Sequence, residues 1–192
     1  MAEFALWQGE RTRAIRGIDA TCPQCEEAMI AKCGRINVHH WAHAANDCDP
    51  WYEPETAWHR GWKALFPDDR TEVSRAGHRA DIVRRDGMVV ELQHSPIAVD
   101  DITIRESAYG KMVWLFDGRD ITNERLILRD RGDYCSFRWK HPRKHYGLCR
   151  RPVFIDLGFT VLRMNKLHLV RPPYGGWGRL LSRQAFVAWL TG

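Results

Sequence analysis

The sequence predicts an α/β protein whose core follows the order helix, three strands, helix, strand. Apolar residues recur at helical spacing in two segments, and short runs rich in branched and aromatic residues lie between and after these segments. The last run, 112–116, is apolar without interruption, which is typical of a strand buried on both faces. The expected elements are helices over 54–66 and 100–109 and strands over 71–74, 79–84, 88–93 and 112–116.

The ends of these elements carry local signals. Pro54 suits the first turn of the first helix because that position needs no backbone N–H, and Pro67 follows the last helical residue. Asp100 is the expected N-cap of the second helix. Around this core we expect a strand or hairpin in 1–19, one or two strands between Val153 and Met164, a loop over 172–178 and a terminal helix from Leu180 to Leu190.

Charge is unevenly distributed along the 192 residues. The net charge is +5, but residues 1–128 carry about −5 and residues 129–192 about +10. The hydrophobic content of 44% and charged content of 28% exclude a disordered chain. No apolar run has the length of a membrane span or of a secretion signal, so we expect a cytoplasmic protein. The expected parts are an N-terminal module over 1–50, a core over 51–128 and a basic extension over 129–192 that packs on the core.

The register of one hairpin predicts a pair of opposed carboxylates. A three-residue loop, Arg85-Asp86-Gly87, places a glycine where the turn requires the left-handed conformation. This loop pairs Asp81 with Glu91 and Arg79 with Gln93, and opposed residues point to the same face. The other face then contains only the apolar residues Ala80, Ile82, Val90 and Leu92. A two-residue loop would mix polar and apolar side chains on both faces, so the pattern favours the first register.

Two interpretations of this polar face remain open. Like charges at that spacing repel, and a divalent cation that prefers oxygen ligands would make the arrangement favourable. Alternatively, the face is solvated and Arg79 neutralises the acids. Glu55, His59 and Lys63 recur at i, i+4 and i+8 and would share one stripe of the preceding helix, either beside the polar face or as an ordinary exposed surface.

Four cysteines and three histidines crowd into residues 22–48. Cys22 and Cys25 have the spacing of a zinc knuckle, and a second pair of ligands must come from His39, His40, His43, Cys33 or Cys48. We favour a structural zinc ion held by Cys22, Cys25, His43 and Cys48, with His40 as an alternative ligand. The competing interpretation is a cluster of unligated buried thiols.

A different metal site is conceivable at His39-His40. This pair near Asn46, within a cysteine framework, has a superficial likeness to a ββα-metal nuclease. Val38 stands where an acidic residue would be needed, and the opposed Asp81 and Glu91 would be left unexplained.

The basic extension contains a segment suited to nucleic acid. Six cations and no acids lie between residues 138 and 151, interleaved with Trp139 and Tyr146 as candidates for base stacking. A generic cationic surface would have the same composition. The expected DNA contacts, to single or double strands, are Arg138, Lys140, Arg143, Lys144, Arg150 and Arg151.

Several short motifs carry a resemblance to a known family. They are Cys22-Pro23-Gln24-Cys25, His40-Trp41-Ala42-His43, Glu55 with His59 and Lys63, Arg79-Ala80-Asp81-Ile82, Glu91-Leu92-Gln93-His94-Ser95, Arg105 to Tyr109, and Val113-Trp114-Leu115. Their order resembles that of the competence protein CoiA-like family, a branch of the PD-(D/E)xK nuclease superfamily, over about residues 20 to 116.

This resemblance implies a restriction-endonuclease-like core and metal-dependent cleavage of DNA phosphodiester bonds. Asp81 and Glu91 would ligate Mg²⁺ or Mn²⁺, with Glu55 as a further acidic contributor. Gln93 replaces the lysine of the superfamily motif, so Lys63, His59 or a second ion must supply positive charge. The alternatives are a non-catalytic zinc-containing nucleic-acid-binding protein and a ββα-metal nuclease centred on His39-His40.

Overall fold

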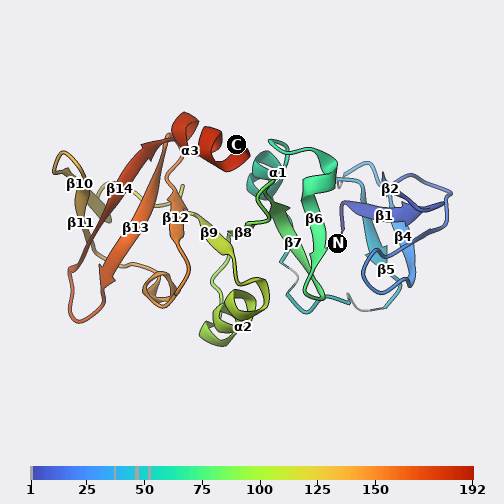
Figure 1. The fold of residues 1–192 in the computed structure, drawn as a ribbon, viewed down its shortest axis with the longest axis horizontal. Coiled ribbons are helices and arrows are strands. Elements are labelled where there is room, and N and C mark those ends of the chain that lie inside the picture. Colours follow the sequence, from blue (N-terminus) through green and yellow to red (C-terminus); the bar gives the residue numbers. More distant parts are fainter. Residues whose placement is uncertain (1, 37, 46–47, 52) are drawn as a thin grey trace.

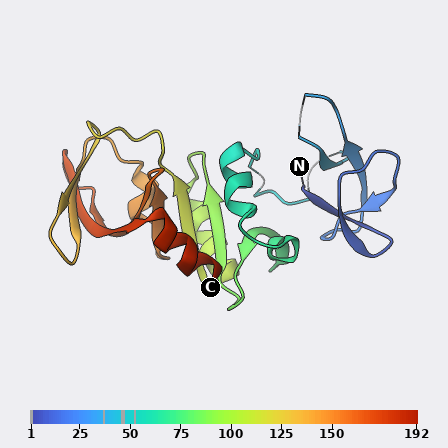
Figure 2. The same cartoon turned by 90° about the horizontal axis from the view of Figure 1, so that it is seen from above.

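The computed structural model describes residues 2–36, 38–45, 48–51 and 53–192. It has a mixed α/β fold with two sheets, which confirms the predicted class. A five-stranded sheet in the order β2-β1-β3-β4-β5 forms an N-terminal module at one end of the molecule (Figure 1). The second sheet has nine strands in the order β10-β11-β14-β13-β12-β9-β8-β7-β6. Seen from above, the module, the helix-flanked centre and the C-terminal strands follow one another along the long axis (Figure 2).

The elements have the following bounds. The N-terminal module contains β1 (Phe4–Trp7), β2 (Glu10–Arg13), β3 (Ala20–Thr21), β4 (Ala28–Lys32) and β5 (His40–His43). The large sheet contains β6 (Thr71–Arg75), β7 (His78–Val83), β8 (Val89–Gln93), β9 (Met112–Asp117), β10 (Leu126–Asp130), β11 (Cys135–Trp139), β12 (Val153–Asp156), β13 (Thr160–His168) and β14 (Tyr174–Ser182). The helices are α1 (Ala57–Lys63), α2 (Val99–Tyr109) and α3 (Arg183–Thr191), with short 3-10 turns η1 (Asp68–Arg70) and η2 (Lys144–Gly147).

The predicted order of the core elements is confirmed. After α1, strands β6, β7 and β8 form an antiparallel meander, and α2 then crosses over to β9, which pairs with β8 in parallel. The expected N-terminal hairpin is also present as β1 and β2. Strand β12 pairs in parallel with β9, so the basic extension continues the same sheet. The boundary placed at 128/129 falls inside β10.

The predicted hairpin register is confirmed at the two pairs next to the loop, but the expected pair of Arg79 with Gln93 is not part of the ladder. Ala80 also packs in the cluster that contains Ile102 of α2, instead of with Ile82, Val90 and Leu92, because the regular alternation of β7 is interrupted at Asp81. Ile82 pairs with Val90 and Val83 with Val89, and the amide of Arg84 donates to the carbonyl of Met88 at 2.9 Å. Gly87 has φ 78°, the left-handed conformation that the three-residue loop requires. The ladder ends at Ile82 and Val90, and beyond it Asp81 and Glu91 are neighbours, with the amide of Asp81 3.4 Å from Oε1 of Glu91.

The first helix begins later than predicted. Thr56 is its N-cap, and its hydroxyl accepts a hydrogen bond from the amide of His59 at 3.3 Å. The ring Nδ1 of His59 in turn accepts from the amide of Thr56 at 3.2 Å, which completes a capping box. Pro54 and Glu55 therefore precede the helix. The expected stripe of Glu55, His59 and Lys63 on one helix was wrong in this respect, because the cap residue had not been recognised.

Two further element ends differ from the prediction. Asp100 lies inside the first turn of α2, whose N-cap is Ala98. The segment 172–178, expected as a loop, supplies most of β14, and Leu180 belongs to this strand instead of the last helix. The glycines of this strand are needed for close strand packing, since a Cβ atom on Gly176 would lie 2.2 Å from the carbonyl oxygen of Lys166.

Apolar residues are buried on both faces of the large sheet. Trp58 and Trp62 of α1 and Phe186 of α3 pack on one face, and Ile102 of α2 packs on the other. Asp156 at the end of β12 ties α1 and α3 to the sheet. Its fully buried Oδ2 accepts hydrogen bonds from the indoles of Trp58 and Trp62 and from the guanidinium of Arg183, at 2.8, 3.1 and 3.0 Å.

The two aromatic residues expected to stack on bases are buried. Trp139 and Tyr146 are each 1% exposed and lie in the core beneath α2. The prediction was wrong for these two residues because β11 alternates inward and outward, and Trp139 falls on the inward positions. His145 is buried beside them and lies next to the ring of Phe116.

No helix among the described residues combines the length and the apolar character that crossing a membrane requires.

We expect Asp156→Asn to destabilise the protein by about 3 kcal/mol, because a buried carboxylate that binds three donors is lost. Urea unfolding measures the change. Asp133→Asn, in an exposed turn, is the control and is expected to change stability by less than about 0.5 kcal/mol. Equal midpoints for the two variants would contradict the role given to Asp156.

Acid is expected to destabilise the fold through His145. Burial, followed by the charge of Arg143, lowers the pKa of His145 to about 4. Between this value and the ordinary pKa near 6.5 the unfolded chain binds more protons than the folded one, so stability falls as pH drops through this window. In urea unfolding at several pH values, His145→Gln should lose less stability between neutral pH and pH about 4 than the wild type. The same loss in both proteins would exclude His145 as the cause.

Candidate active site and metal centre

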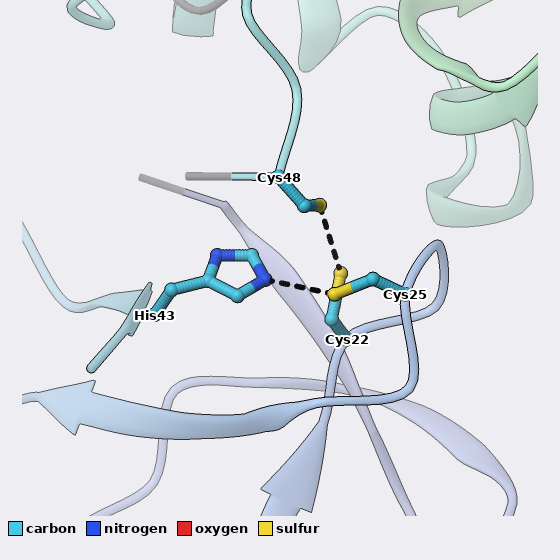
Figure 3. Close-up of side chains that lie close together, drawn as sticks. All are labelled: Cys22, Cys25, His43 and Cys48. Carbon is cyan, nitrogen blue, oxygen red and sulfur yellow. Dashed lines mark hydrogen bonds between the residues drawn. The ribbon is translucent and has the colours of Figure 1, made fainter. Parts of the chain in front are cut away.

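Four ligand side chains converge in the N-terminal module (Figure 3). The ligand atoms of Cys22, Cys25, His43 and Cys48 all lie within 4.8 Å of one another. The sulfurs of Cys22 and Cys48 are 3.7 Å apart, and the sulfur of Cys25 is 3.3 Å from Nε2 of His43. Zinc–sulfur bonds of about 2.3 Å at a tetrahedral angle place two sulfurs about 3.8 Å apart. The set chosen from the sequence is therefore brought together with dimensions that fit zinc.

The chemistry of this Cys3His cluster also suits a cation. All four cysteines of residues 22–48 are free thiols, and Cys33 lies outside the cluster with its thiol near the carbonyl of Ala14. Burial, together with the neighbouring Cys22 and Cys25, raises the pKa of the Cys48 thiol to about 12. A bound Zn²⁺ would offset this by stabilising the thiolates. The residues fit a structural zinc ion that fastens the loop after β3 to β5 and to the chain that follows.

A second group of charged side chains surrounds a cavity of about 50 Å³ beside the hairpin. Such a volume holds an ion with a few waters. The cavity is lined by Asp49, Trp51, Glu53, Glu55, His59, Lys63, Glu72, Arg79, Asp81, Glu91, Leu92 and Arg105. It thus contains Glu55, His59, Lys63, Asp81 and Glu91, five of the six residues predicted to be catalytic.

Lys63 is the central cation of the cavity. Its buried ammonium lies 2.9 Å from Glu72, 3.0 Å from Glu55 and 3.6 Å from Asp81. Burial alone would lower the pKa of Lys63, but the charges of Glu72, Asp81 and Glu55 raise it above its ordinary value. The pKa of Glu72 is lowered despite burial, because Lys63 stabilises its carboxylate. A positive charge is therefore fixed beside Asp81.

Asp81 and Glu91 face each other as the register predicted. The backbone amide of Asp81 is 3.4 Å from Oε1 of Glu91, and Oδ2 of Asp81 accepts from the amide of Leu92 at 2.9 Å. Arg105 of α2 donates to Oε2 of Glu91 at 3.0 Å. Burial and the charge of Asp81 nevertheless raise the pKa of Glu91 to about 8. Burial and the neighbouring Asp81 thus disfavour the charged form of Glu91 despite Arg105, and a cation bound beside it would stabilise its carboxylate.

Gln93 does not line the cavity. It is buried at the end of β8, and its Nε2 donates to the carbonyl of Ser95 at 3.0 Å. His59 does line the cavity, with Nε2 3.3 Å from the carbonyl of Leu92 and 3.8 Å from Glu53. Lys63 forms an ion pair with Asp81 at 3.6 Å.

Several cavity residues were missed in the sequence. Glu72 lies in β6 and binds Lys63, while its other oxygen accepts from the amide of Glu3 in the N-terminal module at 2.7 Å. Glu53 accepts from the amide of Ser95 at 2.5 Å. Glu72 and Glu53 lie in segments that match no motif. The one signal for them in the sequence is the excess of acidic residues before the hairpin.

The chain between the two sheets forms one wall of the cavity. Asp49 follows the zinc ligand Cys48 directly, and its carboxylate accepts from the amides of Trp51 and Arg79 at 3.0 and 2.7 Å. The carbonyl of Trp51 accepts from Arg105, whose guanidinium also lies over the indole ring. The ring of His78 stacks on the indole of Trp51, with 3.2 Å between ring centroids. The zinc module and the carboxylate site are thus linked through a few directly bonded residues.

His39 and His40 lie outside the carboxylate cavity. They line a larger hollow of about 370 Å³ between the N-terminal module and α1, together with Glu55 and Glu72. Nδ1 of His40 is 2.9 Å from the carbonyl of Val38, and His40 is not a member of the Cys3His cluster. Asn46, which the ββα-metal interpretation requires, lies outside the described residues.

The predicted DNA contacts lie on the C-terminal half. Arg138, Lys140, Lys144, Arg150 and Arg151 are exposed. Arg143 is half-buried and donates to the carbonyl of His94 at 2.8 Å, just beyond β8. Of this set, Arg143 is tied most directly to the end of the hairpin.

We expect Cys22→Ser and Cys48→Ser to lose most of the zinc, because each removes a thiolate ligand. Metal analysis of the purified proteins should find about one zinc per chain in the wild type and far less in these variants. Cys33→Ser is the matched control and should retain the metal, since its thiol lies outside the cluster. Unchanged zinc in both ligand variants would show that the ligand set is wrong.

Comparison with known proteins gives a match for the N-terminal part. Residues 6–50 match the family model described as Competence protein CoiA, N-terminal domain. The match covers most of the five-stranded sheet and all four residues of the Cys3His cluster. The comparison with curated proteins gave no match, and neither did the comparison with solved structures. The N-terminal module is thus similar to the N-terminal domain of competence protein CoiA.

Proposed function

We propose that this protein is a metal-dependent nuclease of the PD-(D/E)xK type that hydrolyses phosphodiester bonds in DNA. The observation that carries the proposal is the pair of half-buried Asp81 and buried Glu91, which lie together in a cavity that also holds Lys63. The order of core elements agrees with what the family resemblance implies, and the similarity of residues 6–50 to a CoiA domain points in the same direction.

The donor set of this cavity fits Mg²⁺ or Mn²⁺. Both are hard cations that bind carboxylate oxygens, and Mg²⁺ is commonly held by one or two carboxylates with water and substrate phosphate completing its shell. Asp81 and Glu91 would hold the ion, and Glu55 would contribute through its shell. When bound, the ion supplies Lewis-acid stabilisation of the phosphate and lowers the pKa of the attacking water.

The chain's own residues have separate tasks in this proposal. Lys63 keeps a fixed positive charge beside Asp81 and can stabilise negative charge that develops on the phosphate. Arg105 orients Glu91 through a direct ion pair and is itself held by the carbonyl of Trp51. His59, held at the N-terminus of α1 by the capping box, lies on the cavity wall where it can contact the substrate.

The test is cleavage of plasmid and single-stranded DNA with Mg²⁺ or Mn²⁺. Asp81→Asn and Glu91→Gln preserve size and should each lower the rate at least about a hundredfold, because a metal ligand is lost. Glu124→Gln, at an exposed position far along the chain from the hairpin, is the control and should cleave like the wild type. Circular dichroism checks that all variants are folded.

Two outcomes would reject the proposal. If both Asp81→Asn and Glu91→Gln cleave DNA at the wild-type rate, these carboxylates are not the active site. A wild-type protein that binds DNA but cleaves with neither metal would instead be the non-catalytic zinc-containing binding protein.

A further inference from the structure

The structure assigns a single-stranded nucleic-acid binding face to the C-terminal end of the large sheet. The outer face of β10, β11, β14 and β13, on the side away from α2, carries exposed aromatic rings surrounded by cations, and we call it the outer sheet face. Its residues are Arg129, Arg131, Tyr134, Arg138, Arg163, Lys166, Trp177 and Arg179. These strands lie at the end of the molecule opposite the N-terminal module (Figure 1).

The strand register brings these distant residues together. Arg129 pairs with Ser136, Ser136 with Trp177, and Trp177 with Lys166, so one row crosses all four strands. Arg163 pairs with Arg179 in the neighbouring part of the sheet. Directly opposed residues point to the same face. The alternate positions, among them Phe137, Trp139, Leu162 and Met164, point into the core beneath the sheet.

Two exposed aromatic rings lie side by side on this face. Trp177 is 43% exposed and Tyr134 is 44% exposed, and their ring centroids lie 6.2 Å apart in an edge-to-face arrangement. Gly175, two residues before Trp177 on the same face, has no side chain to fill the adjacent position. Exposed rings on a flat sheet are a platform on which unpaired bases stack.

The charge of the face is uniformly positive. Six Arg and Lys residues occupy it, and residues 126–182, all of them described, place no acidic side chain at its paired outward positions. None of the six cations forms an ion pair with an acidic residue in the described part of the chain. Arg131 is oriented over the face by its contact with the hydroxyl of Ser136, at 3.2 Å. These charges complement a phosphate backbone.

The combination favours a single strand over other partners. In a duplex the bases stack on each other and expose only their edges, whereas a single strand can lay a base on Trp177. A protein partner would cover a more apolar centre with fewer charges. Binding at this face does not rest on the proposed nuclease function.

Fluorescence anisotropy with a labelled oligothymidylate of about twelve nucleotides tests the inference, in buffer without added divalent cation. The wild type should bind this strand more tightly than a duplex of equal length. Trp177→Ala should weaken binding about tenfold through loss of stacking, and Trp177→Phe should weaken it less. Trp7→Ala removes an indole of similar exposure from the N-terminal module and should bind like the wild type.

The salt dependence of binding tests the cations. For the double variant Arg163→Ala with Arg179→Ala, the slope of log affinity against log salt should fall in magnitude by about 1.4, since each phosphate contact on a single strand contributes about 0.7. Lys32→Ala, at an exposed position on β4, should leave the slope unchanged.

If the Trp177→Ala variant is folded and binds the strand with wild-type affinity, the inference is overturned. A loss of self-association or of protein binding in this variant, with DNA affinity unchanged, would show that the face binds protein and would overturn it equally. The wild type could also bind the strand without cleaving it, while Trp177→Ala weakens binding as expected. That result would reject the proposed nuclease function and support binding at the outer sheet face.

Discussion

The arrangement of this protein depends on the buried carboxylate of Asp156. It lies at the end of the central strand β12 and binds two indoles of α1 and a guanidinium of α3. A buried charge of this kind is tolerated only when donors surround it, so the helices are fixed in place on one face of the sheet. Because α1 also carries His59 and Lys63, a residue from the C-terminal half positions a wall of the carboxylate cavity. The basic extension is therefore part of the core's architecture.

Charge compensation then determines the character of the cavity. Lys63 neutralises acids from three different segments, and one of them, Glu72, also binds the N-terminal module through the amide of Glu3. Arg105 forms an ion pair with Glu91, but burial and the charge of Asp81 still raise the pKa of this carboxyl group. On the other side, the chain that leaves the Cys3His cluster at Cys48 continues directly into the cavity wall. The Cys3His cluster and the carboxylate cavity are therefore joined by a short, hydrogen-bonded stretch of chain.

Local patterns were sufficient for a large part of the fold and of the site. The order of core elements, the three-residue hairpin loop and the opposition of Asp81 and Glu91 follow from spacing, because the period of a strand and the geometry of a tight turn are properties of neighbouring residues. The four members of the Cys3His cluster were chosen on the same basis. The predictions were wrong where two local signals disagreed. Pro54 suggested the start of α1, but Thr56 is the N-cap, and the glycines of β14 suggested a loop where the chain forms a strand.

The sequence by itself determined which residues face each other across a hairpin and which ligands share a short segment. Only the tertiary structure decided that Trp139 and Tyr146 are buried, that Gln93 stays outside the cavity, and that Trp177 and Tyr134 meet on an exposed face. These outcomes depend on pairing between strands far apart in the chain, and a shift of one residue exchanges the two faces of a strand. Composition can therefore identify a basic and aromatic segment, but long-range register decides which of its side chains reach solvent.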